Sequence, residues 1–248
     1  MGIQPLVILV LPLGMGEESS EELRGAFSNC CVNIISSSNL EGFLSQDRNT
    51  DLIERVAGDA RPRRITVVGY CSGAGLAINL VAVTNQNIDK LILVAGEFLM
   101  GDPAHQTDFS RGMDQVLNLA LRSQQDAEVV SNSMNQMREV MPGADTWALA
   151  NFNPFKDGAY LYSYAKAYHK YKKNDYLELA KAIETEVHFI YGEADEVVNS
   201  KAGENMLSAF RNARMWFEEG DHKSIFNSSS KVTRLVLELT EATHDNLG

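Results

Sequence analysis

Short apolar runs alternate with longer amphipathic segments along most of the chain. Strand-like runs, many of them rich in β-branched residues, occupy residues 6–11, 32–35, 65–68, 91–95, 187–191 and 215–218. Apolar residues at helical spacing occupy residues 20–27, 52–56, 74–83, 202–210 and 231–239. Strands that alternate with helices predict a mostly parallel sheet with helices on both faces. Nearly continuous apolar strands agree, because parallel strands are buried on both sides. The pattern therefore indicates the α/β class.

The alternation is interrupted between residues 103 and 182. Helices are expected there over residues 113–121 and 126–141, and Pro142-Gly143 would end the second one. A helical insertion between two core strands is typical of a lid, and an ordinary helical subdomain is the alternative. We expect a core of residues 1–102 and 183–248, with a helical lid of residues 103–182.

Composition and charge exclude several classes of protein. The 248 residues are 44% hydrophobic, which is too apolar for a disordered chain, and no apolar run approaches the ~20 residues of a membrane span. The formal net charge of −11 disfavours a nucleic-acid partner. The N-terminal run lacks the basic flank of a signal peptide. Three cysteines without disulfide or metal-ligand spacing indicate a cytoplasmic protein with no metal or cofactor.

One segment carries the pattern of a nucleophile elbow. A β-branched strand ends in Gly69-Tyr70-Cys71-Ser72-Gly73 and passes directly into an apolar helix. The turn needs very small residues two positions on either side of the nucleophile. Cys71 meets this requirement and Ser72 does not, since Tyr70 lies two positions before it.

Cys71 is therefore the predicted nucleophile. Its place at a helix N-terminus is expected to favour the thiolate. The alternative is an inert buried cysteine in a structural glycine turn. Cys30 and Cys31 are interpreted as residues at the start of a strand.

A thiol nucleophile needs a base, and His222 is the predicted one. It lies in a loop between the last strand and the last helix, at the edge of the sheet where the predicted elbow also lies. The other histidines are less suitable: His188 lies inside a strand, His105 and His169 lie in the insertion, and His244 lies near the end of the chain.

The acid that orients the base should follow the fifth strand. Asp195 comes after a glycine turn and is preferred to Glu193 and Glu196, which are expected to be solvated. Glu97, just past the fourth strand, is the alternative acid. The order nucleophile, acid, base along the chain is the one expected of this elbow.

An oxyanion site needs two donors. The backbone N–H of Ser72 is one candidate, and the N–H of Leu13, in the loop after the first strand, is the other. A plain glycine turn is the alternative explanation of that loop.

With these loops in order, the chain resembles the α/β-hydrolase superfamily over nearly its whole length. Within it, the chain is most similar to thioesterases of polyketide and nonribosomal-peptide assembly lines, in residues 11–14, in the elbow and in the helical lid before Asp195. It departs from them in carrying Cys71 where most have serine, and it lacks the His-x-Gly-Gly loop of many hydrolases. The resemblance implies a thioesterase or acyltransferase that acts on acyl thioesters through Cys71, His222 and Asp195.

Cysteine suits transfer as well as hydrolysis, because an acyl-cysteine is itself a thioester and exchange between thiols is nearly isoenergetic. Two alternatives stay open. One is a small-molecule ester or lactone hydrolase of the dienelactone type, and the other is a non-catalytic binding protein with a hydrolase fold.

The predicted lid contains a basic, tyrosine-rich segment. Residues 158–181 hold five lysines against two acidic residues, and six of the eight tyrosines of the chain. Such a surface suits an acidic acyl or peptidyl carrier protein. A solvated lysine face over a tyrosine-packed helix is the alternative. The candidate docking residues are Lys166, Lys170, Lys172 and Lys173.

Overall fold

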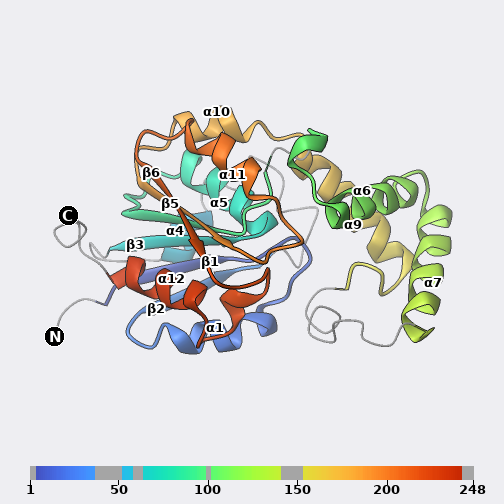
Figure 1. The fold of residues 1–248 in the computed structure, drawn as a ribbon, viewed down its shortest axis with the longest axis horizontal. Helices are drawn as coiled ribbons and strands as arrows, with labels where there is room; N and C mark the ends of the chain where they lie inside the picture. Colours follow the sequence, from blue (N-terminus) through green and yellow to red (C-terminus); the bar gives the residue numbers. More distant parts are fainter. Residues whose placement is uncertain (1–3, 37–51, 58–63, 99–101, 141–152, 242–248) are drawn as a thin grey trace.

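A six-stranded parallel sheet forms the centre of the computed structural model, which describes residues 4–36, 52–57, 64–98, 102–140 and 153–241 (Figure 1). The strand order is β2-β1-β3-β4-β5-β6, and all neighbours are parallel. The strands are β1 (Leu6–Val10), β2 (Cys31–Ile35), β3 (Ile65–Tyr70), β4 (Lys90–Val94), β5 (Glu186–Gly192) and β6 (Ala213–Glu218). Each lies within two residues of its predicted ends, so the apolar runs located the sheet correctly.

Helices cover both faces of the sheet, as Figure 1 shows for α5, α10 and α11 on one side and α1 and α12 on the other. Their bounds are α1 (Glu21–Ala26), α4 (Leu52–Ala57), α5 (Ser72–Val83), α10 (Tyr176–Lys181), α11 (Ser200–Leu207) and α12 (Lys231–Glu241). In β1, Leu6 and Ile8 join the cluster under α5, while Val7 and Leu9 join the cluster under α12. Both faces are therefore buried, which explains why the strands are apolar without alternation.

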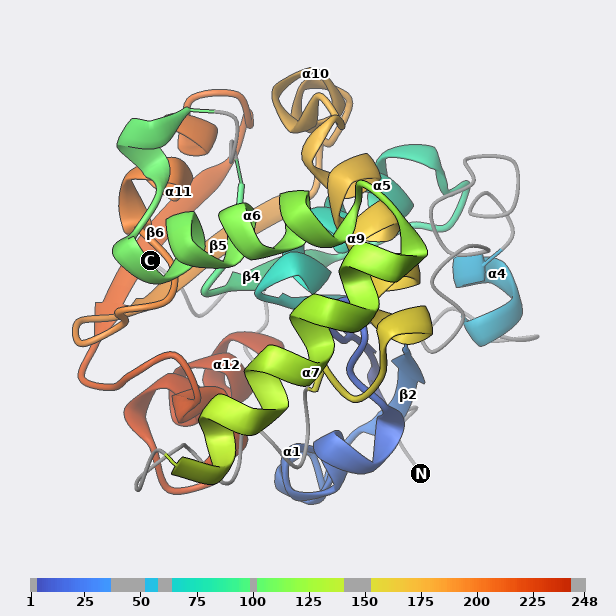
Figure 2. The same cartoon turned by 90° about the vertical axis from the view of Figure 1, so that its right-hand side faces the viewer.

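Three insertion helices, α6 (Asp108–Ala120), α7 (Gln124–Val140) and α9 (Gly158–Lys172), extend beyond the edge of the sheet where the strands end (Figures 1 and 2). α6 begins at a capping box, in which the Thr107 hydroxyl accepts the Ser110 N–H at 3.1 Å. α10 packs against α5, so the last part of residues 103–182 covers the core. The expected Pro142-Gly143 helix stop lies outside the described residues.

Three short 3₁₀ helices, η1 (Glu17–Ser20), η2 (Pro103–His105) and η3 (Ser224–Phe226), complete the described elements. None of the helices in the described ranges is long and apolar enough to cross a membrane.

His188 in β5 belongs to a buried polar network. Its Nδ1 accepts the indole N–H of Trp216 at 3.1 Å, which leaves the proton on Nε2, 3.3 Å from a carboxylate oxygen of Glu186. Burial lowers the pKa of His188 to about 4, although Glu186 opposes this shift. The expected structural role of His188 inside the sheet is consistent with this position.

We expect this histidine to make stability depend on pH. With a pKa of about 4 in the folded state and about 6.5 in the unfolded state, the unfolded chain takes up the proton first. The contribution of neutral His188 to the free energy of unfolding is therefore at its maximum above pH 6.5, and at pH 5 it is lower by about 2 kcal/mol. Urea unfolding of the protein and of His188→Asn at pH 7.5 and pH 5 measures this. An equal pH dependence in both proteins would contradict the assignment.

Candidate active site

Cys71 lies on the sharp turn between β3 and α5. Its φ of 53° and ψ of −125° are unusual for a residue with a side chain. A Cβ on Gly69 would lie 2.7 Å from the Cα of Ala74, and one on Gly73 would collide with the carbonyl oxygen of Val10. The glycine spacing thus has the steric reason expected from the sequence, and the turn presents Cys71 to a cavity.

His222 and Asp195 meet beside this turn, from the loops after β6 and β5. The Nδ1 of His222 lies 2.9 Å from the Oδ2 of Asp195. The other carboxylate oxygen of Asp195 accepts the N–H groups of Val197 and Val198, both at 2.9 Å. Only 3% of the Asp195 side chain is exposed, so the carboxylate is fixed. It holds the imidazole proton on Nδ1 and leaves Nε2 available to accept a proton.

Tyr70, the residue before Cys71, positions the His222 loop. Its hydroxyl donates to the carbonyl oxygen of His222 at 2.9 Å, and its ring centre lies 5.1 Å from that of His222. On another side it packs edge-on against Phe226, at 5.0 Å between ring centres. Sequence reasoning missed this role, because no local signal connects Tyr70 to a loop 152 residues later.

Glu97, the alternative acid, has other partners than His222. Its carboxylate accepts the Tyr168 hydroxyl at 2.9 Å, and its main-chain N–H donates to the carbonyl oxygen of Cys71 at 3.3 Å. Burial raises the pKa of Glu97. Of the two predicted acids, Asp195 is the one bonded to His222 in this structure.

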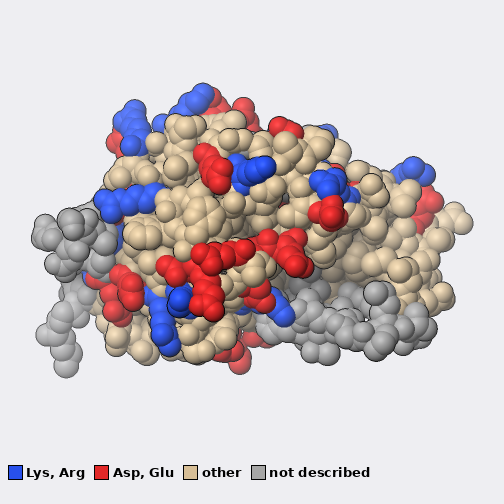
Figure 3. Space-filling view, viewed as in Figure 1, with Lys and Arg blue, Asp and Glu red and all other residues tan. Residues whose placement is uncertain are grey.

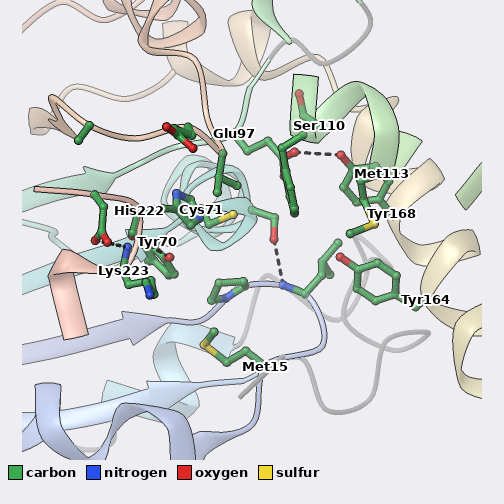
Figure 4. Close-up of a pocket in the computed structure, with 18 residues that line it drawn as sticks. Met15, Tyr70, Cys71, Glu97, Ser110, Met113, Tyr164, Tyr168, His222 and Lys223 are labelled. Carbon is green, nitrogen blue, oxygen red and sulfur yellow. Dashed lines mark hydrogen bonds between the residues drawn. The ribbon is translucent and has the colours of Figure 1, made fainter. Parts of the chain in front are cut away.

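Leu13 and Ser72, the two predicted oxyanion donors, bond to each other. The N–H of Leu13 donates to the hydroxyl oxygen of Ser72 at 3.0 Å (Figure 4). The Leu13 N–H is thus engaged before any substrate binds, which the sequence did not indicate. The N–H and the hydroxyl of Ser72 both form hydrogen bonds with Cys71. These two bonds lower the pKa of the thiol.

The balance of effects nevertheless favours the protonated thiol. Burial raises the pKa of Cys71 well above its ordinary value, and the negative charge of Glu97 adds to this, against the opposing Ser72 bonds. This direction is opposite to the one expected from the helix N-terminus. Attack by Cys71 then requires a base that takes its proton.

The other histidines that the structure describes lie away from Cys71. His188 is buried in β5, His105 lies with its Nε2 2.6 Å from the amide nitrogen of Asn205, and His169 is exposed on α9. His244 lies outside the described residues. Of the histidines that the structure places, only His222 lines the cavity in front of Cys71. Within the described ranges, no cluster of three or more His, Cys, Asp or Glu side chains could hold a metal ion.

The cavity has a volume of about 540 Å³ and lies between the strand-end loops and the insertion helices (Figure 4). Most of its wall is apolar or aromatic, and a volume of this size suits an organic group of drug-like dimensions. The apolar and aromatic residues that line it include Pro12, Leu13, Met15, Tyr70, Phe109, Met113, Tyr164, Tyr168 and Val197.

The lysines of residues 158–181 fall into two groups. Lys166, Lys170 and Lys173 are exposed, whereas the ammonium of Lys172 lies 2.5 and 2.6 Å from the two carboxylate oxygens of Asp114 and ties α9 to α6. Most tyrosines of the segment pack inward, as the alternative interpretation of this segment expects. The buried ones are Tyr164, Tyr168, Tyr171 and Tyr176.

Comparison with known structures identifies the fold. No protein-family model and no curated protein matches this sequence. A hydrolase from Oleispira antarctica superposes with a TM-score of 0.71 at 14% identity, over 98% of this chain and 93% of the other. The chain has the α/β-hydrolase fold.

Two further structures with this fold are similar over nearly the whole chain. An esterase from Exiguobacterium antarcticum has a TM-score of 0.66 at 15% identity, over 98% of this chain and 94% of its own. An enol-lactonase from Burkholderia xenovorans LB400 has a TM-score of 0.67 at 16% identity, over 97% and 93%. The fold class predicted from the sequence is therefore confirmed.

Proposed function

We propose that the protein is a thioesterase or acyltransferase in which Cys71 is acylated by a thioester. The observation that carries the proposal is the placement of Cys71 on a strained elbow, in one cavity with a histidine that bonds a buried aspartate. This is the arrangement that nucleophilic acyl transfer needs. The esterase and enol-lactonase among the structural neighbours support the broader class of hydrolytic chemistry.

In the proposed reaction, the sulfur of Cys71 attacks the thioester carbonyl carbon while Nε2 of His222 takes the thiol proton. The carbonyl π electrons move to the oxygen, and the N–H of Ser72 donates to the resulting oxyanion. Collapse of this intermediate breaks the bond to the leaving thiol, which receives the proton from His222. An acceptor then repeats the cycle on acyl-Cys71, with His222 again as base and Asp195 stabilising the imidazolium.

The hydroxyl of Ser72 is the second oxyanion donor in this scheme. Since it already accepts the Leu13 N–H, it is polarised to donate its own proton. We expect Ser72→Ala to lower kcat/KM about 100-fold, the effect of losing one oxyanion donor. It should also slow alkylation of Cys71 by iodoacetamide at pH 8, since the thiol loses a hydrogen bond.

Ser72→Thr keeps the hydroxyl and should retain most of the rate. If the N–H of Leu13 instead donates directly to the oxyanion, Ser72→Ala would free this N–H from its bond to Ser72, and kcat/KM would not fall. Steady-state kinetics of the two variants distinguish these outcomes.

A small-molecule ester or lactone hydrolase is the second candidate, favoured by the enol-lactonase neighbour. Measuring kcat/KM for a pantetheine thioester, an oxygen ester and a lactone of similar acyl size separates the two. We expect the thioester to react at least ten times faster than the other substrates. A faster lactone or oxygen ester would instead support the second candidate.

Docking of an acidic carrier protein is proposed for the exposed lysines Lys166, Lys170 and Lys173. We expect reversal of these three charges to glutamate to raise KM for a carrier-bound thioester about tenfold at low salt, because exposed charges steer encounter. KM for the matching pantetheine thioester should not change. Lys201→Glu on α11 is the control for altered net charge. An unchanged KM for the carrier substrate would remove this docking surface from the proposal.

A further inference from the structure

A carboxylate lies inside the cavity without a counter-ion. Glu97 is only 9% exposed and lines the same cavity as Cys71. Tyr168 donates to one of its oxygens at 2.9 Å. No side chain of the described residues forms an ion pair with it, and Figure 4 shows Glu97 among the residues that line the cavity. A buried carboxylate of this kind is costly unless something pairs with it.

The two basic side chains that act most strongly on Glu97 are already bonded to other acids. His222 bonds Asp195 at 2.9 Å, and Lys172 bonds both oxygens of Asp114. Each acts on Glu97 only through space. The cavity therefore contains a carboxyl group that forms no ion pair with any of the described residues.

The wall beside Glu97 favours a cation over a neutral donor. The rings of Tyr164 and Tyr168 are stacked, with 6.1 Å between their centres and 18° between their planes, and both line the cavity. Aromatic faces attract ammonium groups, most strongly where water is excluded. A hydroxyl group would gain a hydrogen bond from Glu97 but little from these rings.

The entrance to the cavity is acidic as well. Glu196 and Asp221 are exposed lining residues, and Glu193 and Glu219 are exposed in the same two loops. Figure 3 shows Asp and Glu gathered in a band across this face, over β6 and the loop before α12. Lys223 is the one Lys or Arg among the lining residues described. Such a rim attracts cationic substrates and repels anionic ones.

We propose that the acyl group of the substrate carries a protonated amine close to its reacting carbonyl, and that Glu97 binds this amine. The main-chain N–H of Glu97 donates to the carbonyl oxygen of Cys71, and both residues line the same cavity. The inference rests on the proposed function and names its substrate class as amino-acyl thioesters. Tyr168 holds the carboxylate in place, and the rings of Tyr164 and Tyr168 contact the bound ammonium.

The test uses three pantetheine thioesters of equal chain length, an α-amino acyl, its α-hydroxy analogue and the unsubstituted acyl. The rate of acyl-Cys71 formation is followed by intact-mass spectrometry in the wild type, in Glu97→Gln and in Glu204→Gln, an exposed carboxylate on α11. We expect the wild type to prefer the amino substrate about 30-fold, the range of a hydrogen bond to a charged group. Glu97→Gln should reduce the preference below threefold, and Glu204→Gln should keep it.

The wild-type comparison needs no variant and so does not depend on folding of Glu97→Gln. Equal acylation by all three substrates, preference for the hydroxy analogue, or an unchanged preference in Glu97→Gln would overturn the amine site while leaving Cys71 acylation intact. Absence of an adduct with every substrate would overturn the proposed function together with it.

Discussion

Cys71→Ala is expected to abolish acyl transfer and to leave the fold unchanged. The backbone at this position already accommodates a Cβ at a φ of 53°, and the side chain faces the cavity, so removing the sulfur disturbs little packing. Loss of a covalent nucleophile typically costs 10⁴-fold or more in turnover. Steady-state turnover of a thioester and thermal unfolding of the variant measure both parts of the expectation.

The two other cysteines provide the matched controls. Cys30 and Cys31 are free thiols at the start of β2, outside the cavity lining. Cys30→Ala and Cys31→Ala should therefore keep wild-type turnover. A Cys71→Ala protein that still turns over thioesters would contradict the role given to Cys71.

Asp195→Asn is expected to lower turnover by about 10³- to 10⁴-fold with little change in structure. The N–H groups of Val197 and Val198 hold one oxygen of Asp195, so the amide oxygen of the variant should stay with them. The amide NH₂ then faces Nδ1 of His222 and donates to it. This places the imidazole proton on Nε2, the atom that must accept the proton of Cys71.

Glu97→Gln separates the two predicted acids, with an unsubstituted acyl thioester as substrate so that amine binding plays no part. Because Asp195 bonds His222 and Glu97 does not, Asp195→Asn should cause the larger loss of kcat. Steady-state kinetics of both variants across pH 6 to 9 make the comparison. A larger loss in Glu97→Gln would assign the orienting role to Glu97.

The parts of the site that could be predicted from the sequence are those with a local cause. The sheet follows from short apolar runs. The elbow follows from glycines at positions where a Cβ would collide with neighbouring backbone atoms. Asp195 and His222 could be chosen because each lies in a loop after a core strand, and parallel strands end at the same edge. Each of these inferences needed only a few neighbouring residues.

The parts that could not be predicted depend on contacts between distant segments. Tyr70 reaches the His222 loop, and the Ser72 hydroxyl takes the Leu13 N–H that was expected to face the substrate. The thiolate expectation was wrong because it considered the helix N-terminus and omitted desolvation and the charge of Glu97. Four of the six tyrosines that suggested an interface in the sequence are buried in the core.

The formation of acyl-Cys71 tests the central claim most directly. A rapid quench into acid during turnover of a pantetheine thioester, followed by intact-mass spectrometry and peptide mapping, shows whether an acyl group is attached and where. We expect the mass of one acyl group on the peptide that contains Cys71, and none in Cys71→Ala. Unmodified protein throughout turnover, or an acyl group attached to a different residue, would contradict the account.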